Sequence, residues 1–119
     1  MRKLTLVLLA ALIIVPTTTH AEMRADQLMW QCEASKDTLK GATDLTYCAG
    51  YIAGITDMNA ILPALHLPKI FCIPGKKGVS NDRLRLIFLK WAEEHPAELH
   101  YSARASVLVA LSETFPCKK

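Results

Sequence analysis

Cysteine and histidine are the residue types in this chain best suited to metal binding or nucleophilic chemistry, and the chain has four of each. The cysteines are Cys32, Cys48, Cys72 and Cys117, and the histidines are His20, His66, His95 and His100. No two cysteines have the Cys-x-x-Cys spacing of zinc sites, and Pro96 separates His95 from His100, so this pair does not share one face of a helix. Disulfides are therefore favoured over a metal site, and we expect no metal and no cofactor.

The N-terminus has the pattern of a secretory signal peptide. Arg2 and Lys3 precede an apolar run from Leu4 to Val15, and the polar stretch that follows ends at the small residue Ala21. The apolar run is shorter than the roughly 20 residues of a membrane span. We therefore expect residues 1–21 to be a signal peptide cleaved after Ala21, and residues 22–119 to form one exported domain without membrane attachment.

Cleavage would also change what the charge implies about partners. Loss of Arg2 and Lys3 lowers the formal net charge from +3 to +1, so the balance of charge gives no indication of a nucleic-acid partner. All four cysteines remain in an exported domain too small to have a large core. Two disulfides are the expected use of an even number of cysteines in such a domain.

Helical periodicity predicts the elements that would position these cysteines. No segment of useful length alternates as a strand does. The predicted fold class is all-α, a small bundle of four main helices stapled by two disulfides. The expected helices run from Ala25 to about Ser35, from a cap at Thr43 or Asp44 to about Ile61, from a cap at Ser80 to near His95, and from a cap at Ser102 to about Phe115.

The helix order favours one disulfide pairing. Lys36–Ala42 is expected to be a connector between two antiparallel helices, which would bring Cys32 close to Cys48. Cys72 would then pair with Cys117. Four cysteines allow three connectivities, so this pairing is a preference.

Gly50 and Gly54 lie four positions apart inside an apolar helix, where each glycine costs about 1 kcal/mol relative to alanine. We favour the interpretation that they let another helix of the core come close. The alternative is that this small face is a homodimer seam or receives a partner's side chain.

Four sequence elements occur in a specific order: YCAGYIAGITD from Tyr47, CIP from Cys72, HPAELH from His95 and ALSETFPC from Ala110. Together with the helix from Val79 to Pro96, they resemble the Rap/Tai family of type VI secretion amidase immunity proteins, over roughly Cys32 to Cys117. The insert Gly75-Lys76-Lys77-Gly78 departs from this pattern, because relatives are expected to have a more compact connection there.

The resemblance implies a periplasmic immunity protein that binds a peptidoglycan amidase effector, occludes its active site and is no enzyme itself. The residues agree with this: no catalytic residue is predicted, because the cysteines are assigned to disulfides and Glu93, Glu94 and His95 lie on a solvated helix end. Two alternatives remain, a small periplasmic helical chaperone or stress-response binding protein without catalytic activity, and a structural subunit of an envelope assembly.

The segment from His66 to Lys77 is rich in proline and glycine and contains Cys72. We expect a mostly exposed loop that is held firm at its base by the disulfide, a good design for an inhibitory element. The predicted partner-binding residues are His66, Lys69, Lys76 and Lys77. The alternative is a solvated connector whose lysines only aid solubility.

Overall fold

The structure is a computed structural model that describes residues 21–118. The predicted signal peptide lies outside the described residues except for Ala21. The regular structure of residues 21–118 comprises four α-helices, α2 (Ala25–Cys32), α3 (Leu39–Ile61), α4 (Asn81–Glu94) and α5 (Ala103–Thr114), and two 3-10 helices, η1 (Leu62–Leu65) and η2 (Pro96–Glu98). Within this range the only β contact is an isolated bridge between Arg24 and Ser102. The predicted all-α fold class is confirmed.

Three of the predicted helix starts are confirmed. Helix α2 begins at Ala25 as expected, although it ends at Cys32, before the expected Ser35, and α4 and α5 follow their predicted serine caps. The Ser80 hydroxyl accepts a hydrogen bond from the Arg83 amide at 3.2 Å, and the Ser102 hydroxyl accepts one from the Ala105 amide at 3.3 Å. Each hydroxyl satisfies an amide that has no partner inside the helix. Helices α4 and α5 therefore begin where their serine caps predict.

The start of α3 was predicted wrongly. The cap is Thr38, whose hydroxyl accepts a hydrogen bond from the Gly41 amide at 3.0 Å, so the helix begins at Leu39 and includes most of the expected connector. Gly41 is buried, and a Cβ built on it would lie 1.7 Å from the carbonyl oxygen of Ser35. This glycine lets the preceding turn fold against the helix, and does not interrupt the helix.

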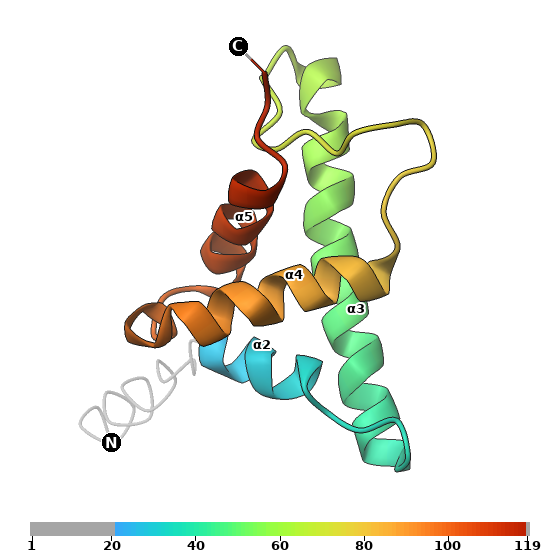
Figure 1. Cartoon of the computed structure of the whole chain (residues 1–119), viewed down its shortest axis with the longest axis vertical. Helices are drawn as coiled ribbons and strands as arrows, with labels where there is room; N and C mark the ends of the chain where they lie inside the picture. The colour runs from blue at the N-terminus through green and yellow to red at the C-terminus, as the bar shows by residue number, and fades with distance from the viewer. Residues whose placement is uncertain (1–20, 119) are drawn as a thin grey trace, which may run out of the picture.

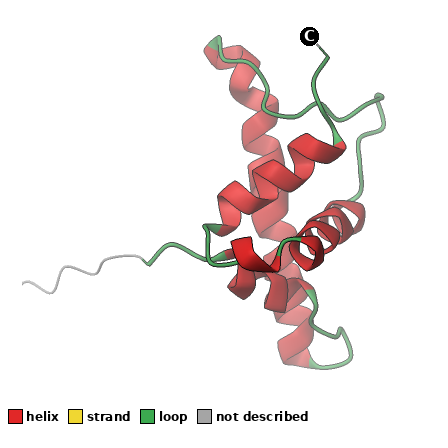
Figure 2. Ribbon diagram, turned by 60° about the vertical axis from the view of Figure 1, so that its left-hand side comes forward, coloured by secondary structure: helices red, strands yellow, loops and turns green. Residues whose placement is uncertain are grey.

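Helix α3 runs along the long axis of the molecule, and α4 and α2 cross it (Figure 1). With 23 residues it spans about 35 Å. A second view shows the same crossed arrangement of helices and the loops between them (Figure 2). Each of the four helices contacts the other three. None of the helices in residues 21–118 combines the length and apolarity that a membrane span requires.

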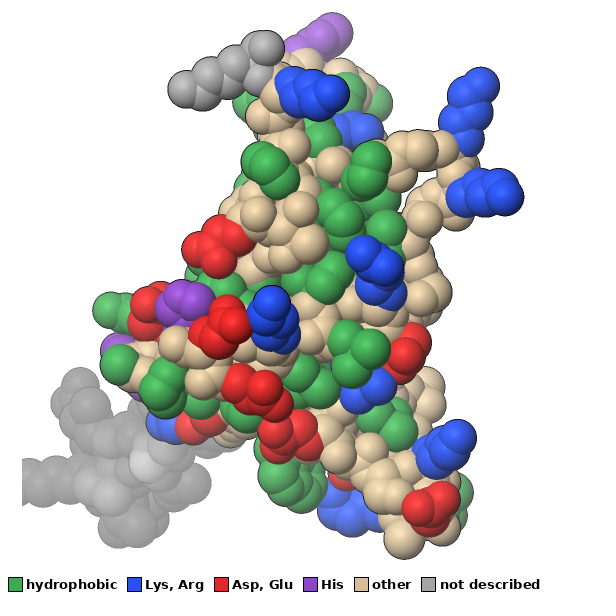
Figure 3. Space-filling view, in the orientation of Figure 1, with side chains coloured by type: hydrophobic (Ala, Val, Ile, Leu, Met, Phe, Trp, Pro, Cys, Tyr) green, Lys and Arg blue, Asp and Glu red, His purple; other side chains and the backbone are tan. Residues whose placement is uncertain are grey.

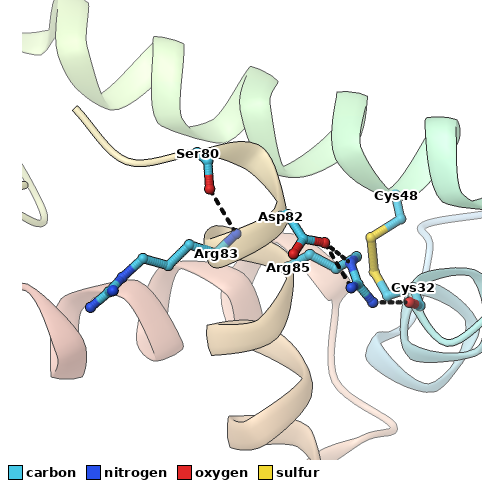
Figure 4. Close-up of polar contacts among 6 residues, drawn as sticks. All are labelled: Cys32, Cys48, Ser80, Asp82, Arg83 and Arg85. Atoms are coloured by element: carbon cyan, nitrogen blue, oxygen red, sulfur yellow. Dashed lines mark hydrogen bonds and ion pairs between the residues drawn. A yellow bond between two sulfur atoms is a disulfide. The ribbon is translucent and has the colours of Figure 1, made fainter. Parts of the chain in front are cut away.

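The core lies where α2, α4 and α5 meet the middle of α3. Leu28, Ile52, Phe88 and Leu111 contribute to it from the four helices, and each is at most 1% exposed. Arg85 of α4 reaches across to α2, where its guanidinium donates a hydrogen bond at 2.9 Å to the carbonyl oxygen of Cys32 (Figure 4). The same guanidinium is paired with Asp82 at 2.7 Å, so it links the start of α4 to the end of α2.

Both predicted disulfides are present, one between Cys32 and Cys48 and the other between Cys72 and Cys117. The first joins α2 to α3, and both of its residues are fully buried. The second is partly exposed and joins the segment before α4 to the residues after α5. One bridge therefore belongs to the core, whereas the other fastens irregular chain at the surface.

We expect loss of the second bridge to lower stability by more than its exposed position suggests, because the bridge restricts the unfolded chain. It closes a loop of 45 residues, so the double variant Cys72→Ser/Cys117→Ser should lose about 4 kcal/mol of unfolding free energy on the loop-entropy model. Urea denaturation of oxidised variant and wild type measures this loss. Equal stabilities would contradict a structural role for the bridge.

Candidate partner-binding surface

The connecting loop, residues 66–80, carries the predicted partner-binding residues and joins η1 to α4. It begins at His66, which adopts a left-handed conformation with a φ of 59° and ends η1. Its amide donates a hydrogen bond at 3.1 Å to the carbonyl oxygen of Pro63, and the next amide, that of Leu67, donates one to Leu62 at 3.0 Å. These two bonds turn the chain back toward α3.

A buried asparagine on α3 fixes the middle of the connecting loop. The side-chain oxygen of Asn59 accepts hydrogen bonds from the amides of Ile70 at 2.8 Å and Phe71 at 3.3 Å. Its amide nitrogen donates at 2.9 Å to the carbonyl oxygen of Phe71. Asn59 is only 6% exposed, so it satisfies backbone groups that would otherwise be buried without partners. This one side chain provides the hydrogen bonds that regular secondary structure would otherwise provide where the connecting loop passes α3.

Phe71 and Cys72 complete the anchor. The Phe71 side chain is fully buried in the hydrophobic core. The amide of Cys72 donates a hydrogen bond at 2.8 Å to the carbonyl oxygen of Phe115, next to the disulfide with Cys117. We call Asn59, Phe71 and Cys72 the loop anchor. It fastens the connecting loop to α3, to the core and to the chain after α5.

Beyond the loop anchor the chain projects from the body of the molecule, as the upper right of Figure 1 shows. Gly75 and Gly78 have φ values of 82° and 70°, a conformation that side chains with a Cβ rarely adopt. Lys76 and Lys77 lie between them and are exposed. The two glycines therefore form a projecting turn that presents both lysines to solvent.

The four predicted partner-binding residues fall on both sides of the anchor. His66 and Lys69 precede it, Lys76 and Lys77 follow it, and all four side chains are exposed. No acidic residue occurs in the sequence between Asp57 and Asp82, so no carboxylate side chain of the connecting loop offsets the lysines. The connecting loop therefore carries a net positive charge.

Gly50 and Gly54 do not pack against another helix of the described chain. Both are exposed, and a Cβ built on either would meet no atom within 4 Å. The favoured interpretation, a close helix neighbour in the core, is wrong, because the core contacts α3 through the side that carries Cys48 and Ile52. The glycines lie instead on an outward side, which we call the α3 face, with Tyr47, Met58 and Ile61, whose exposed fractions are 48%, 57% and 51%.

The described residues offer little for acid–base or metal chemistry. In residues 21–118 no group of three or more metal-ligating side chains occurs, and all four cysteines form disulfides. His95 stacks on Trp91 and donates from Nδ1 to the Trp91 carbonyl oxygen at 2.7 Å, a local role at the end of α4. The hydrogen bond from Arg24 lowers the pKa of the Asp26 carboxyl, and this exposed pair is a surface contact at the start of α2.

Sequence reasoning missed Asn59 and Phe71, two of the three parts of the loop anchor. A polar residue near the end of an apolar helix, followed by irregular chain, is the signal that could have predicted the contact of Asn59. Phe71 lies in the apolar run Ile-Phe-Cys-Ile inside the proline- and glycine-rich segment. An apolar run in an otherwise irregular segment indicates a buried anchor point.

Residues 21–118 thus form a small helical domain with two disulfides and a fastened, cationic surface loop. The family model of the Rap1a immunity proteins matches residues 24–117. The chain therefore belongs to the Rap1a immunity protein family, and the resemblance to Rap/Tai immunity proteins is confirmed. A search of curated proteins gave no match to the chain.

The loop anchor predicts a specific stability effect. Asn59→Ala leaves the amides of Ile70 and Phe71 and the Phe71 carbonyl oxygen without their partner, which should lower the free energy of unfolding by about 2 kcal/mol. Asn81→Ala is the matched control, because Asn81 is exposed, and it should change stability by less than about 0.5 kcal/mol. Chemical denaturation compares the two variants, and equal effects would show that the Asn59 contacts carry no net stability.

Proposed function

We propose that this protein is a periplasmic immunity protein that binds a type VI secretion peptidoglycan amidase effector and inhibits it by occluding its active site. Membership of the Rap1a immunity family supports an immunity function against a secreted effector. The choice of an amidase as the effector rests on the resemblance to Rap/Tai proteins. On this proposal the protein has no catalytic activity, and its whole effect comes from binding.

The observation that carries the proposal is the loop anchor. A flexible loop loses conformational entropy when a partner orders it, whereas a loop already fixed at its centre loses less. Asn59, Phe71 and Cys72 fix the connecting loop by hydrogen bonds, burial and a disulfide, and leave Lys76 and Lys77 exposed beyond it. A fixed base with a projecting tip suits insertion into the concave active site of an enzyme.

Export to the periplasm is part of the same proposal. The two disulfides are of the kind that persists in oxidising compartments. The proposed signal peptide, residues 1–21, would direct the chain there, and residues 22–119 would form the mature domain. An inhibitor in that compartment meets an amidase where its peptidoglycan substrate is found.

We also propose that the protein forms a homodimer through the α3 face. Exposed glycines on a helix permit close backbone approach of a second helix, and Tyr47, Met58 and Ile61 would supply apolar contact around them. Burial of Gly50 and Gly54 in such an interface would account for two glycines that cost helix stability without serving the core.

Inhibition is the direct test of the immunity function. Purified oxidised protein titrated into a panel of type VI amidases acting on isolated sacculi should abolish the activity of its cognate enzyme at a 1:1 ratio. Lys76→Glu/Lys77→Glu should weaken inhibition at least about tenfold, because both charges are exposed and reversed, while the melting temperature stays unchanged.

Two outcomes of that titration count against the proposal. If no type VI amidase of the host or its competitors is slowed, the immunity function against amidases fails. If an amidase is inhibited equally by the wild type and the double variant, the two lysines take no part in the contact.

The homodimer has its own test. Gly54→Leu should raise monomer stability by up to about 1 kcal/mol, since the site is open and leucine favours a helix, but it should block self-association in analytical ultracentrifugation. Ala60→Leu is the matched control, because Ala60 is exposed on α3 away from the α3 face. A wild-type protein that sediments as a monomer at high concentration would contradict the dimer.

A further inference from the structure

An open groove lies beside the disulfide between Cys72 and Cys117. It is lined by Ile73, Pro74, Thr114, Phe115, Pro116 and Lys118, next to Cys72. Its walls therefore come from the connecting loop on one side and from the end of α5 and the following residues on the other. We call it the tail groove. In Figure 3 apolar side chains fill the area between the C-terminal segment and the projecting loop.

The cations around the tail groove differ from most others in the described chain. Ion pairs engage Arg24, Lys40, Arg85, Lys90 and Arg104. In contrast, none of the four lysines nearest the groove forms an ion pair with another described residue, and they are Lys69, Lys76, Lys77 and Lys118. Exposed lysines without ion pairs raise the electrostatic potential of the surface around them.

The disulfide brings lysines that are distant in sequence to the same groove. The Sγ atom of Cys117 lies 3.7 Å from the carbonyl oxygen of Lys69, and Lys118 is the next residue after Cys117. Lys76 and Lys77 follow within three residues of Pro74, which lines the groove. Lys118 therefore lines the groove, the backbone of Lys69 lies beside the disulfide, and Lys76 and Lys77 lie on the turn that follows the groove wall.

We propose that the tail groove and its four lysines form one docking surface for an acidic segment of the effector. This proposal rests on the proposed function, and it extends the contact from the tip of the connecting loop to the residues after α5. An apolar side chain of the segment occupies the groove, and carboxylates on either side of it meet the lysines. Charge complementarity sets the chemistry of this partner, because the four lysines form no ion pair with another described residue and are exposed.

The matched test uses the two lysines that the loop tip does not include. Lys69→Glu/Lys118→Glu should weaken inhibition of the cognate amidase about fivefold or more and reduce its dependence on salt concentration. Lys36→Glu is the control, because Lys36 is an exposed lysine without an ion pair among the described residues and lies in the α2–α3 connection, at the other end of α3. The Lys36→Glu variant should inhibit the amidase as strongly as the wild type does.

A second probe does not depend on any amidase. A short synthetic peptide of glutamates around a central leucine, titrated into the isotope-labelled protein, should shift backbone amide signals in residues 72–77 and 114–118. The same peptide with lysines in place of glutamates should cause no shifts there. Shifts at these residues support the docking surface, whether or not any amidase of the panel is inhibited. The absence of an inhibited amidase counts only against the proposed function.

Two results would overturn the docking surface. One is an amidase that is inhibited equally by Lys69→Glu/Lys118→Glu and Lys36→Glu, which leaves the immunity function intact. The other is an acidic peptide that shifts no signal, or shifts signals only outside residues 72–77 and 114–118.

Discussion

The rest of the connecting loop depends on the contact between Asn59 and the backbone of Ile70 and Phe71. Three hydrogen bonds made by one buried side chain hold an irregular segment of the chain against α3. This contact lets the Phe71 side chain enter the core and sets Cys72 opposite Cys117. Without it, the amides of this crossing would be buried without partners, and the loop would have to leave the surface of the helix.

The two disulfides have different structural roles, one in the core and one at the surface. The bridge between Cys32 and Cys48 is fully buried and joins the helices of the core, where Arg85 also binds the Cys32 carbonyl oxygen. The bridge between Cys72 and Cys117 lies at the surface and connects the two walls of the tail groove. A small domain with a marginal core can in this way keep a binding surface ordered although it is built from irregular chain.

The sequence predicted the fold more fully than the candidate site. Ser80 and Ser102 cap their helices as their positions indicate, and hairpin geometry predicted the bridge between Cys32 and Cys48, because these features depend on local chain direction. The bridge between Cys72 and Cys117 followed as the remaining pair. The start of α3 was missed because Gly41 resembles a break but serves close packing. Gly50 and Gly54 were assigned to the core because spacing alone does not say which side of a helix is buried. The role of Asn59 depends on a contact twelve residues away, which no local pattern encodes.

Hydrogen–deuterium exchange on the oxidised protein, alone and with an inhibited amidase, tests the central claim most directly. The amides of Ile70, Phe71 and Cys72 donate hydrogen bonds in the free protein and should exchange slowly, whereas those of residues 75–79 donate none to other described residues and should exchange fast. Binding should slow exchange in residues 75–79 and leave the three anchored amides unchanged. Fast exchange at Ile70 to Cys72 in the free protein, or unaltered exchange at residues 75–79 in the complex, would contradict an anchored loop that meets the partner.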